Sequence, residues 1–278
     1  MQLTYEQVIE MNAVQLEIFR AFVEVCEKLN LTYYMVHGSL LGSVIHKGFF
    51  PFDDDIDVAM FRKDYDILMS KGQEYLPKGL FLQSCSTQSE FPLPFGKIRK
   101  SETAFVQPMF KNLNINMGIY IDIFPIDYYP DNSIKKLLLR CKEAIYSARI
   151  STRLFYDNKQ PIWKRLIARI SIFLVPSWEK AVRKRASLYA VMPRSRYVIV
   201  VGGKIDERGI PIKWFGKGSC QSFEGISITC PLMLKKYLQQ IYGDYKNYNP
   251  VQAYLNDDNT LTVSASKFSV EKSYRELL

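Results

Sequence analysis

The stretch that decides the fold spans residues 37–57 and reads HGSLLGSVIHKGFFPFDDDID. It begins with a Gly-Ser turn and ends with four aspartates in five positions: Asp53, Asp54, Asp55 and Asp57. Apolar residues then alternate with aspartate, as they do in a β-strand. Because side chains two positions apart on a strand leave the same face, we expect Asp55 and Asp57 to lie side by side.

A third aspartate, Asp122, stands between two isoleucines in the run 119–124, which we expect to form a strand closed by Pro125. Adjacent carboxylates repel and raise each other's pKa unless a cation lies between them. A buried carboxylate also needs a partner. Hard oxygen ligands favour Mg²⁺ or Mn²⁺. We therefore predict that Asp55, Asp57 and Asp122 hold one such ion and form the catalytic centre.

Gly38 and Ser39 lie between a strand predicted over 32–36 and a short helix predicted over 40–46. Glycine allows close approach to the backbone, and a helix N-terminus offers free N–H groups to an anion. An anion site beside paired carboxylates is the layout of metal-assisted phosphoryl transfer. An aspartate run can also be a solvated loop or a helix cap, and we favour that interpretation for Asp53 and Asp54.

The flanking sequence predicts helices interleaved with strands, which is typical of an α+β fold. Residues 4–30 form an amphipathic helix that opens with a capping box at Thr4 and Gln7. A second helix is expected over 62–71 and a third over 231–243. Strands are expected over 80–84 and 196–203, and a hairpin over 95–99 and 103–106.

The segment 132–189 carries 14 Lys and Arg but three Asp and Glu, a net charge of +11, whereas the whole chain carries +9. Its pattern predicts two or three helices, interrupted at Pro161 and Pro176. Basic helices with aromatic anchors, here Trp163 and Trp178, suit an anionic membrane surface. We predict peripheral membrane contact through this segment, with a merely solvated subdomain as the alternative. Nucleic acid is not expected as a partner, since no nucleic-acid-binding motif is present.

Composition narrows the class of protein further. The 278 residues include five cysteines without a CxxC pair and two histidines, which argues against a disulfide framework and against cysteine or histidine metal sites. Neither a secretory leader nor an apolar run of the roughly 20 residues that cross a membrane is visible. We expect a cytoplasmic protein, with any membrane association peripheral and on the inner face.

The stretch 37–57 resembles the signature of the LicD family of phosphotransferases. This family is part of the nucleotidyltransferase-like superfamily, which also includes the fukutin-related proteins. Weaker similarities follow in the same order at LPFGKIR (93–99), IDIFPID (121–127), FEG (223–225) and YGDY (242–245). One position departs from the pattern, since Ile45 stands where we expect an arginine. If that arginine holds phosphate in relatives, this chain must use another cation or a different donor.

The resemblance implies a nucleotidyltransferase-like mixed sheet flanked by helices, with a catalytic core over 1–130, a basic helical insertion over 131–195 and a C-terminal part over 196–278 that completes the core. It also implies transfer of a phospho-alcohol, such as phosphocholine, from a CDP-linked donor to a hydroxyl of a glycan or its lipid-linked precursor. A nucleotidyltransferase using an NTP, or a non-catalytic nucleotide- or glycan-binding module, remains the alternative. The sequence does not identify the alcohol.

In this interpretation the metal bound by the three aspartates bridges the donor phosphates, and Asp122 either completes the metal site or takes the proton of the acceptor hydroxyl. Further residues are assigned to binding of the donor and its phosphates: Gly38, Ser39, His46, Lys47, Lys97, Arg99 and Glu224. Lys97 and Arg99 alternate on one strand, so both can face the pyrophosphate, although a solvated pair at a sheet edge is the alternative.

Overall fold

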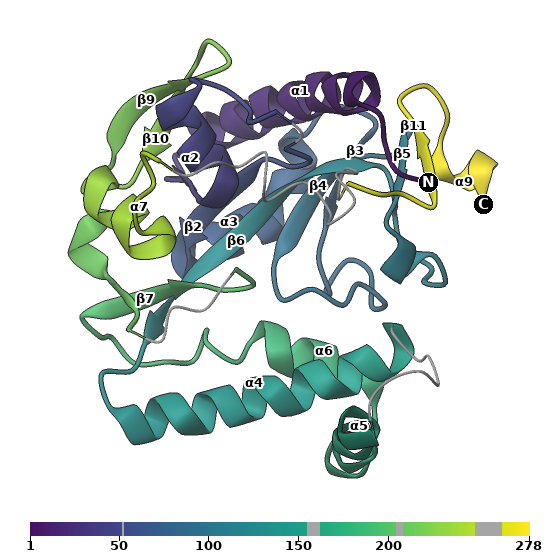
Figure 1. The fold of residues 1–278 in the computed structure, drawn as a ribbon, viewed down its shortest axis with the longest axis vertical. Helices are drawn as coiled ribbons and strands as arrows, with labels where there is room; N and C mark the ends of the chain where they lie inside the picture. The colour runs from purple at the N-terminus through teal and green to yellow at the C-terminus, as the bar shows by residue number, and fades with distance from the viewer. Residues whose placement is uncertain (52, 155–161, 204–207, 248–262) are drawn as a thin grey trace.

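A computed structural model describes residues 1–51, 53–154, 162–203, 208–247 and 263–278 (Figure 1). Its centre is a mixed sheet of seven strands in the order β1-β2-β6-β4-β3, with β7 beside β6 and β8 beside β7. The strands are β1 (Tyr34–Met35), β2 (Asp57–Phe61), β3 (Leu80–Gln83), β4 (Gly96–Lys100), β6 (Ile119–Tyr129), β7 (Tyr197–Val200) and β8 (Ile210–Pro211). The sheet and its covering helices confirm the expected α+β class.

Strand β6 is the axis of this sheet. It runs parallel to β2 on one side and antiparallel to β4 and β7 on the other. The prediction that Pro125 ends this strand is wrong. Pro125 lies where the partner changes, because β4 pairs as far as Ile123 and β7 pairs from Ile126. The missing N–H of proline therefore costs no ladder hydrogen bond, while the Pro125 carbonyl accepts one from Val201 at 2.9 Å.

Three helices cover the N-terminal half of the sheet: α1 (Tyr5–Leu29), α2 (His37–Ile45) and α3 (Arg62–Lys71). The predicted capping box of α1 is confirmed, since Thr4 and Gln7 each satisfy the backbone N–H of the other. Helix α1 packs across β4 and β6, and α3 packs against β2 and β6 (Figure 1). Their apolar faces make one core with the sheet.

Two boundaries near the aspartates differ from the prediction. Helix α2 begins at His37, so Gly38 and Ser39 lie in its first turn. Strand β2 begins at Asp57, so Asp55 lies in the preceding loop. The parallel ladder reaches back one residue further, to the Ile56 carbonyl that accepts the Asp122 N–H at 2.8 Å.

The predicted hairpin over 95–106 is wrong. The turn exists, with Thr103 N–H donating to the Lys100 carbonyl at 3.2 Å, but the strands on its two sides have other partners. Strand β4 pairs with β3 and β6, whereas β5 (Ala104–Val106) pairs with β11 (Lys267–Ser269). Strand β11 and helix α9 (Tyr274–Leu277) lie near the C-terminus, where the sequence analysis named no element.

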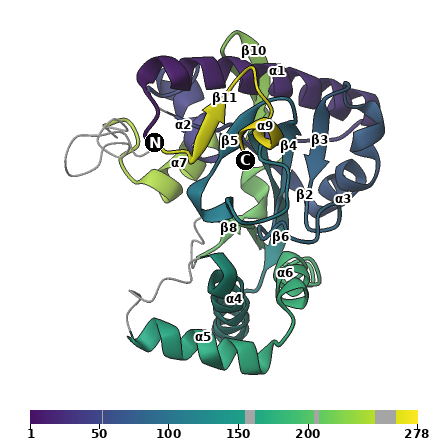
Figure 2. The same ribbon diagram turned by 90° about the vertical axis from the view of Figure 1, so that its right-hand side faces the viewer.

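The basic segment forms three helices, as predicted: α4 (Ser133–Leu154), α5 (Ile162–Leu174) and α6 (Trp178–Ala186). They pack on one another at the side of the sheet remote from α1 (Figures 1 and 2). The prediction that Trp178 is a surface anchor is wrong, because its ring is 5% exposed and its Nε1–H donates to the Ile150 carbonyl. The side chain of Trp163 lies outside the described residues.

The remaining elements follow β8. A two-stranded sheet consists of β9 (Ser219–Phe223) and β10 (Ile226–Cys230), and α7 (Leu234–Tyr242) is the predicted helix that ends at Gly243. Short 3-10 turns are η1 (Gly72–Tyr75), η2 (Pro108–Phe110) and η3 (Ile212–Trp214). All five cysteines are free. None of the helices in the described ranges has the length and apolar character that crossing a membrane requires. The division of the chain at 130 and 195 stays a prediction.

Candidate active site

Strand register brings three reactive side chains into one row. Asp57 on β2 is opposite Asp122 on β6, and Asp122 is opposite Lys97 on β4. Residues that face each other across neighbouring strands project from the same face of the sheet. The row therefore crosses the three adjacent strands β2, β6 and β4 at the middle of the sheet (Figure 1).

The carboxylates that the sequence singles out converge. Asp55, Asp57 and Asp122 each offer one oxygen, and these oxygens lie within 4.8 Å of one another. Asp57 and Asp122 are buried, at 7% and 6% exposed, whereas Asp55 is half-buried. A second set within the same limit consists of Asp53, Asp54 and Asp55, so the two sets share Asp55. We refer to these five aspartates as the acidic cluster.

The acidic cluster carries more negative charge than its surroundings offset. Burial raises the pKa of Asp55 and of Asp57, and repulsion from neighbouring carboxylates raises both further. Burial also raises the pKa of Asp122, although Lys97 opposes that shift. Among the described residues, no lysine or arginine lies within ion-pair distance of Asp55 or Asp57. Enclosed, like-charged oxygen donors with too little positive charge fit a small divalent cation such as Mg²⁺ or Mn²⁺.

Lys97 is the cation closest to this cluster. Its ammonium group forms an ion pair with the Asp122 carboxylate and lies 3.2 Å from the centre of the Tyr120 ring. The side chain is 2% exposed, and burial lowers the pKa of Lys97 to about 8 in spite of the Asp122 charge. Lys97 therefore borders the carboxylates from β4, and its predicted contact with the donor phosphates stays a prediction.

Arg99 lies on the same face of β4 but is committed to the protein interior. Its Nε donates to the Gln83 side chain, and its Nη1 donates to the Gly118 carbonyl at 2.6 Å. The residue is 1% exposed, and burial lowers its pKa to about 10. The alternative of a solvated edge pair is wrong for both Lys97 and Arg99. The observed contacts of Arg99 brace β3, β4 and the start of β6.

Ser39 shapes the aspartate loop. Its buried hydroxyl accepts the Asp57 N–H at 2.9 Å and lies 3.5 Å from the Asp55 carbonyl. The predicted hydroxyl contact with phosphate therefore competes with an existing structural bond. The backbone offers an alternative, because Val36 at the N-cap of α2 provides no side-chain cap. The first N–H groups of α2, around Gly38, therefore lie at an uncapped helix N-terminus, a position that favours an anion.

Glu224 connects distant parts of the chain. Its N–H donates to the Lys47 carbonyl at 2.8 Å, and its Oε1 accepts the Phe49 N–H at 3.1 Å. The close contact needs glycine at position 48, since a Cβ there would lie 1.9 Å from Glu224 Oε1. The structure thus gives Glu224 a positioning role, in which the turn between β9 and β10 holds the loop after α2. Its predicted role in donor binding has no support in these contacts.

The end of α2 is exposed. The His46 ring packs edge-on against Phe50 with 4.8 Å between ring centres, and Lys47 reaches solvent. Ile45, at the position where the resemblance leads us to expect arginine, is 38% exposed. The proposed contacts of His46 and Lys47 with the donor stay predictions.

Asp54 is a candidate that the sequence analysis assigned to the loop. Burial and the Asp122 charge together raise its pKa to about 6, although Lys97 opposes both. Helix α1 holds the loop inward, because Gln15 Nε2 donates to the Asp54 carbonyl at 2.7 Å. The sequence offered no signal for this, since the contact joins segments far apart along the chain.

Two neutral groups beside the acidic cluster also escaped the sequence analysis. The His37 Nε2 is buried without a hydrogen-bond partner in the described part of the chain, and burial lowers the pKa of His37 to about 4. Its ring packs edge-on against Phe124, two residues after Asp122. The Tyr237 hydroxyl on α7 is likewise buried without a partner there, and Asp57 is one of the groups that raise its pKa. The position of His37 directly before Gly38 was the one available signal.

The chain is similar to a protein family model and to known proteins. Residues 30–172 match the family model described as LicD/FKTN/FKRP, nucleotidyltransferase domain. The lipopolysaccharide cholinephosphotransferase LicD of Haemophilus influenzae (strain ATCC 51907 / DSM 11121 / KW20 / Rd) is 26% identical over 264 residues, which cover 87% of this chain and 92% of that protein. An uncharacterized protein of Rickettsia prowazekii (strain Madrid E) is 44% identical over 41 residues, 15% of each chain.

The matched region contains the aspartate loop, β2, β4 and β6, so it includes every member of the acidic cluster and Lys97. The mixed sheet, the order of the motifs and the length of the match agree with one another. The chain therefore belongs to the LicD family of nucleotidyltransferase-like proteins.

Proposed function

We propose that this protein transfers a phospho-alcohol, phosphocholine or a close analogue, from a CDP-linked donor to a hydroxyl of a cell-surface glycan or its lipid-linked precursor. We further propose that the reaction requires Mg²⁺ or Mn²⁺ and takes place at the cytoplasmic side of the membrane. The observation that carries the proposal is the convergence of Asp55, Asp57 and Asp122 within 4.8 Å, in a chain similar over most of its length to a lipopolysaccharide cholinephosphotransferase.

The proposed reaction is a single displacement at phosphorus, with no covalent intermediate on the enzyme. The acceptor hydroxyl oxygen forms a new bond to the phosphorus that carries the alcohol, and the bond from that phosphorus to the bridging oxygen of the donor breaks. CMP leaves with the bridging oxygen, and the hydroxyl proton passes to a carboxylate. When bound, a divalent ion offsets the charge on the donor phosphates.

The residues of the chain supply the other functions. Asp55 and Asp57, with one oxygen of Asp122, would hold the ion, because their oxygens already face one another. The raised pKa of the Asp122 carboxyl suits it to accept the hydroxyl proton, since a base works best when its pKa approaches the operating pH. Lys97 and the uncapped N-terminus of α2 provide positive potential for the donor phosphates.

The decisive experiment is a panel of CDP-choline, CDP-ethanolamine, CDP-glycerol and CDP-ribitol, each incubated with the protein, a lipopolysaccharide acceptor and either Mg²⁺ or EDTA. Release of CMP and the ³¹P signal of the new diester measure transfer. We expect CMP release with one donor of the panel, loss of activity in EDTA, and incorporation of the alcohol into the acceptor.

The alternatives have different products. Release of pyrophosphate from an NTP, with no CMP from any CDP-alcohol, would indicate a nucleotidyltransferase and overturn the proposal. Binding of the donors without turnover would indicate a non-catalytic module. As a matched control, Asp66→Asn changes a side chain that is 62% exposed on α3 and is expected to leave turnover intact, whereas Asp57→Asn should abolish it.

A further inference from the structure

The outer face of α4 is apolar at its N-terminal end. Ile134 is 69% exposed, Leu137 is 60% exposed and Leu138 is 58% exposed. At about 100° per residue these side chains lie on one side of the helix, opposite the buried Leu139 face. Soluble helices normally turn such a stripe toward the core, so an outward stripe calls for a partner.

Helix α5 repeats the pattern more strongly. It packs against α4 and buries Ser171, while large apolar side chains around the rest of the helix stay exposed. The most exposed is Phe173, at 85%, and it is accompanied by Leu166, Ile167, Ile170, Ile172 and Leu174, each at least 44% exposed. We refer to the outward apolar residues of α4 and α5 together as the apolar face.

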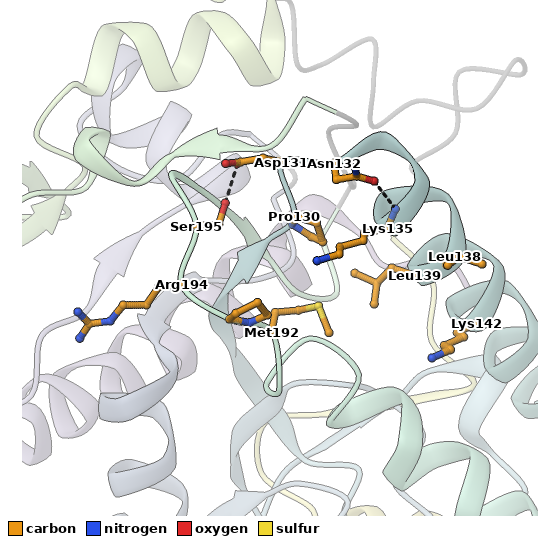
Figure 3. A pocket seen from close by; sticks show the side chains of 11 residues that line it. Pro130, Asp131, Asn132, Lys135, Leu138, Leu139, Lys142, Met192, Arg194 and Ser195 are labelled. Atoms are coloured by element: carbon orange, nitrogen blue, oxygen red, sulfur yellow. Dashed lines mark hydrogen bonds between the residues drawn. The ribbon is translucent and has the colours of Figure 1, made fainter.

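Unpaired cations lie beside the apolar face. A pocket of about 470 Å³ opens along α4, where Lys135 and Lys142 point into it from the helix and Met192 lies on its far wall (Figure 3). Arg194 belongs to the same lining, but its guanidinium points away from the two lysines (Figure 3). None of these three cations has an acidic partner among the described residues, because the nearby Asp131 accepts a hydrogen bond from Ser195 and pairs with Arg196.

This surface is separate from the acidic cluster. The pocket begins at Pro130, directly after β6 ends, whereas Asp122 lies near the start of that strand. The seven residue-to-residue steps from Asp122 to Tyr129 span about 23 Å at ~3.3 Å each. A ligand in the pocket would therefore not contact the catalytic carboxylates.

We propose that the apolar face of α4 and α5 docks on an anionic lipid bilayer, with Lys135 and Lys142 in the pocket receiving a lipid headgroup phosphate and Arg194 adding positive charge to the same surface. The positive charge of this segment favours an anionic bilayer over a second copy of the chain as the partner of the apolar face. Residues 132–189 carry a net +11, so a second copy of the chain would bring a similar positive charge to the same contact and repel it. An anionic bilayer instead offers hydrocarbon for the apolar side chains and phosphate for the cations.

Sedimentation with vesicles tests the proposal on the full chain without donor or acceptor. Vesicles of phosphatidylcholine alone are compared with vesicles containing 30% phosphatidylglycerol, at 50 and 500 mM salt. We expect binding to the anionic vesicles that weakens at high salt, and at least tenfold weaker binding to the neutral vesicles.

Two variants with matched controls assign the binding to this surface. Lys135→Ala/Lys142→Ala/Arg194→Ala should weaken binding by about a hundredfold. The control Lys63→Ala/Lys71→Ala/Lys78→Ala removes the same charge from exposed positions on or after α3 and should weaken it far less.

The apolar pair Leu137→Ser/Phe173→Ser should weaken binding by about tenfold or more. Its control, Ile9→Ser/Leu232→Ser, changes two other apolar side chains, each 51% exposed, and should have no effect. Unchanged thermal unfolding verifies that each variant is folded.

Three results would overturn the proposal. One is binding that does not distinguish anionic from neutral vesicles. Another is an equal loss in the variants and their controls, which would indicate general charge attraction. The third is absence of vesicle binding together with a dimer in light scattering that Leu137→Ser/Phe173→Ser dissociates, which would assign the apolar face to a second copy of the chain.

Discussion

Replacing Asp54 with asparagine should stabilise the metal-free protein. Asp54 lies in the acidic cluster, where burial and the Asp122 charge raise its pKa from 3.8 to about 6. A carboxyl whose pKa rises on folding holds its charge at a cost to the folded state. Asparagine has nearly the same shape and keeps an acceptor oxygen, but it carries no charge.

The size of the effect follows from the two pKa values. A rise of about two units corresponds to about 3 kcal/mol at a pH above both values. Because the half-buried amide retains a desolvation cost of its own, we expect a gain of about 1–3 kcal/mol in the free energy of unfolding. For a chain of this length each kcal/mol raises the unfolding midpoint by roughly 2–4 °C.

The effect has a definite pH dependence. The folded-state pKa of Asp54 is raised, so its contribution to stability is complete below pH 3.8 and is lost as the pH rises through about 6. The advantage of Asp54→Asn should therefore be largest at pH 7.5 and nearly absent at pH 4. A divalent cation offsets the same repulsion, so saturating Mg²⁺ should reduce the advantage at pH 7.5.

Urea unfolding followed by circular dichroism measures the free energy directly. The native chain, Asp54→Asn and the exposed control Asp66→Asn are compared at pH 4 and pH 7.5, each in EDTA and in Mg²⁺. The control should change stability by less than about 0.5 kcal/mol. If Asp54→Asn is less stable than the native chain at pH 7.5 in EDTA, or if its advantage is the same at both pH values, the charge argument for the acidic cluster is refuted.

Three further substitutions test other residues of the candidate site and of the strands that support it. Asp57→Asn should lose Mg²⁺-dependent turnover and the Mg²⁺-induced rise in unfolding temperature while keeping its circular dichroism spectrum; full turnover would contradict the metal role. Ser39→Ala leaves the buried Asp57 N–H without its partner and should lower the free energy of unfolding by about 1–3 kcal/mol in urea. Arg99→Met removes the donors to Gln83 and Gly118 and should lower the free energy of unfolding by about 3 kcal/mol in urea. Unchanged stability with a raised KM for the donor would instead assign Arg99 to substrate binding.

Local signals in the sequence predicted the elements whose stabilising contacts are short in range. The capping box of α1 joins residues three positions apart, and its apolar stripe repeats every helical turn, so both are visible in contiguous sequence. The alternation around Asp122 likewise identified β6, the central strand. Such elements can be predicted because the contacts that stabilise them join residues only a few positions apart.

Strand pairing escaped prediction because it joins segments that are remote in sequence. The turn at Lys100 favours a hairpin locally, yet β4 pairs with the central strand β6 and β5 pairs with β11 near the C-terminus. A proline is normally expected to end a strand because it lacks an N–H. At Pro125, however, the neighbouring strand changes from β4 to β7, so no hydrogen bond is lost.

Some members of the acidic cluster could likewise be predicted from the sequence, whereas others depend on the tertiary fold. Residue type and spacing were enough to predict that Asp55, Asp57 and Asp122 converge, although Asp55 lies in the loop before β2 and not on the strand as predicted. The convergence was expected because buried carboxylates are costly without a shared partner. Asp54 lies in the cluster because Gln15 on α1 hydrogen-bonds to its loop and holds it inward. Glu224 positions the loop after α2 because the turn between β9 and β10 lies beside that loop. Composition by itself revealed the basic segment, but the fold alone decided that Trp178 is buried and that the apolar side chains of α4 and α5 face outward. Backbone hydrogen-bonding rules and side-chain periodicity act between near neighbours, whereas burial and pairing depend on which distant segments exclude water together.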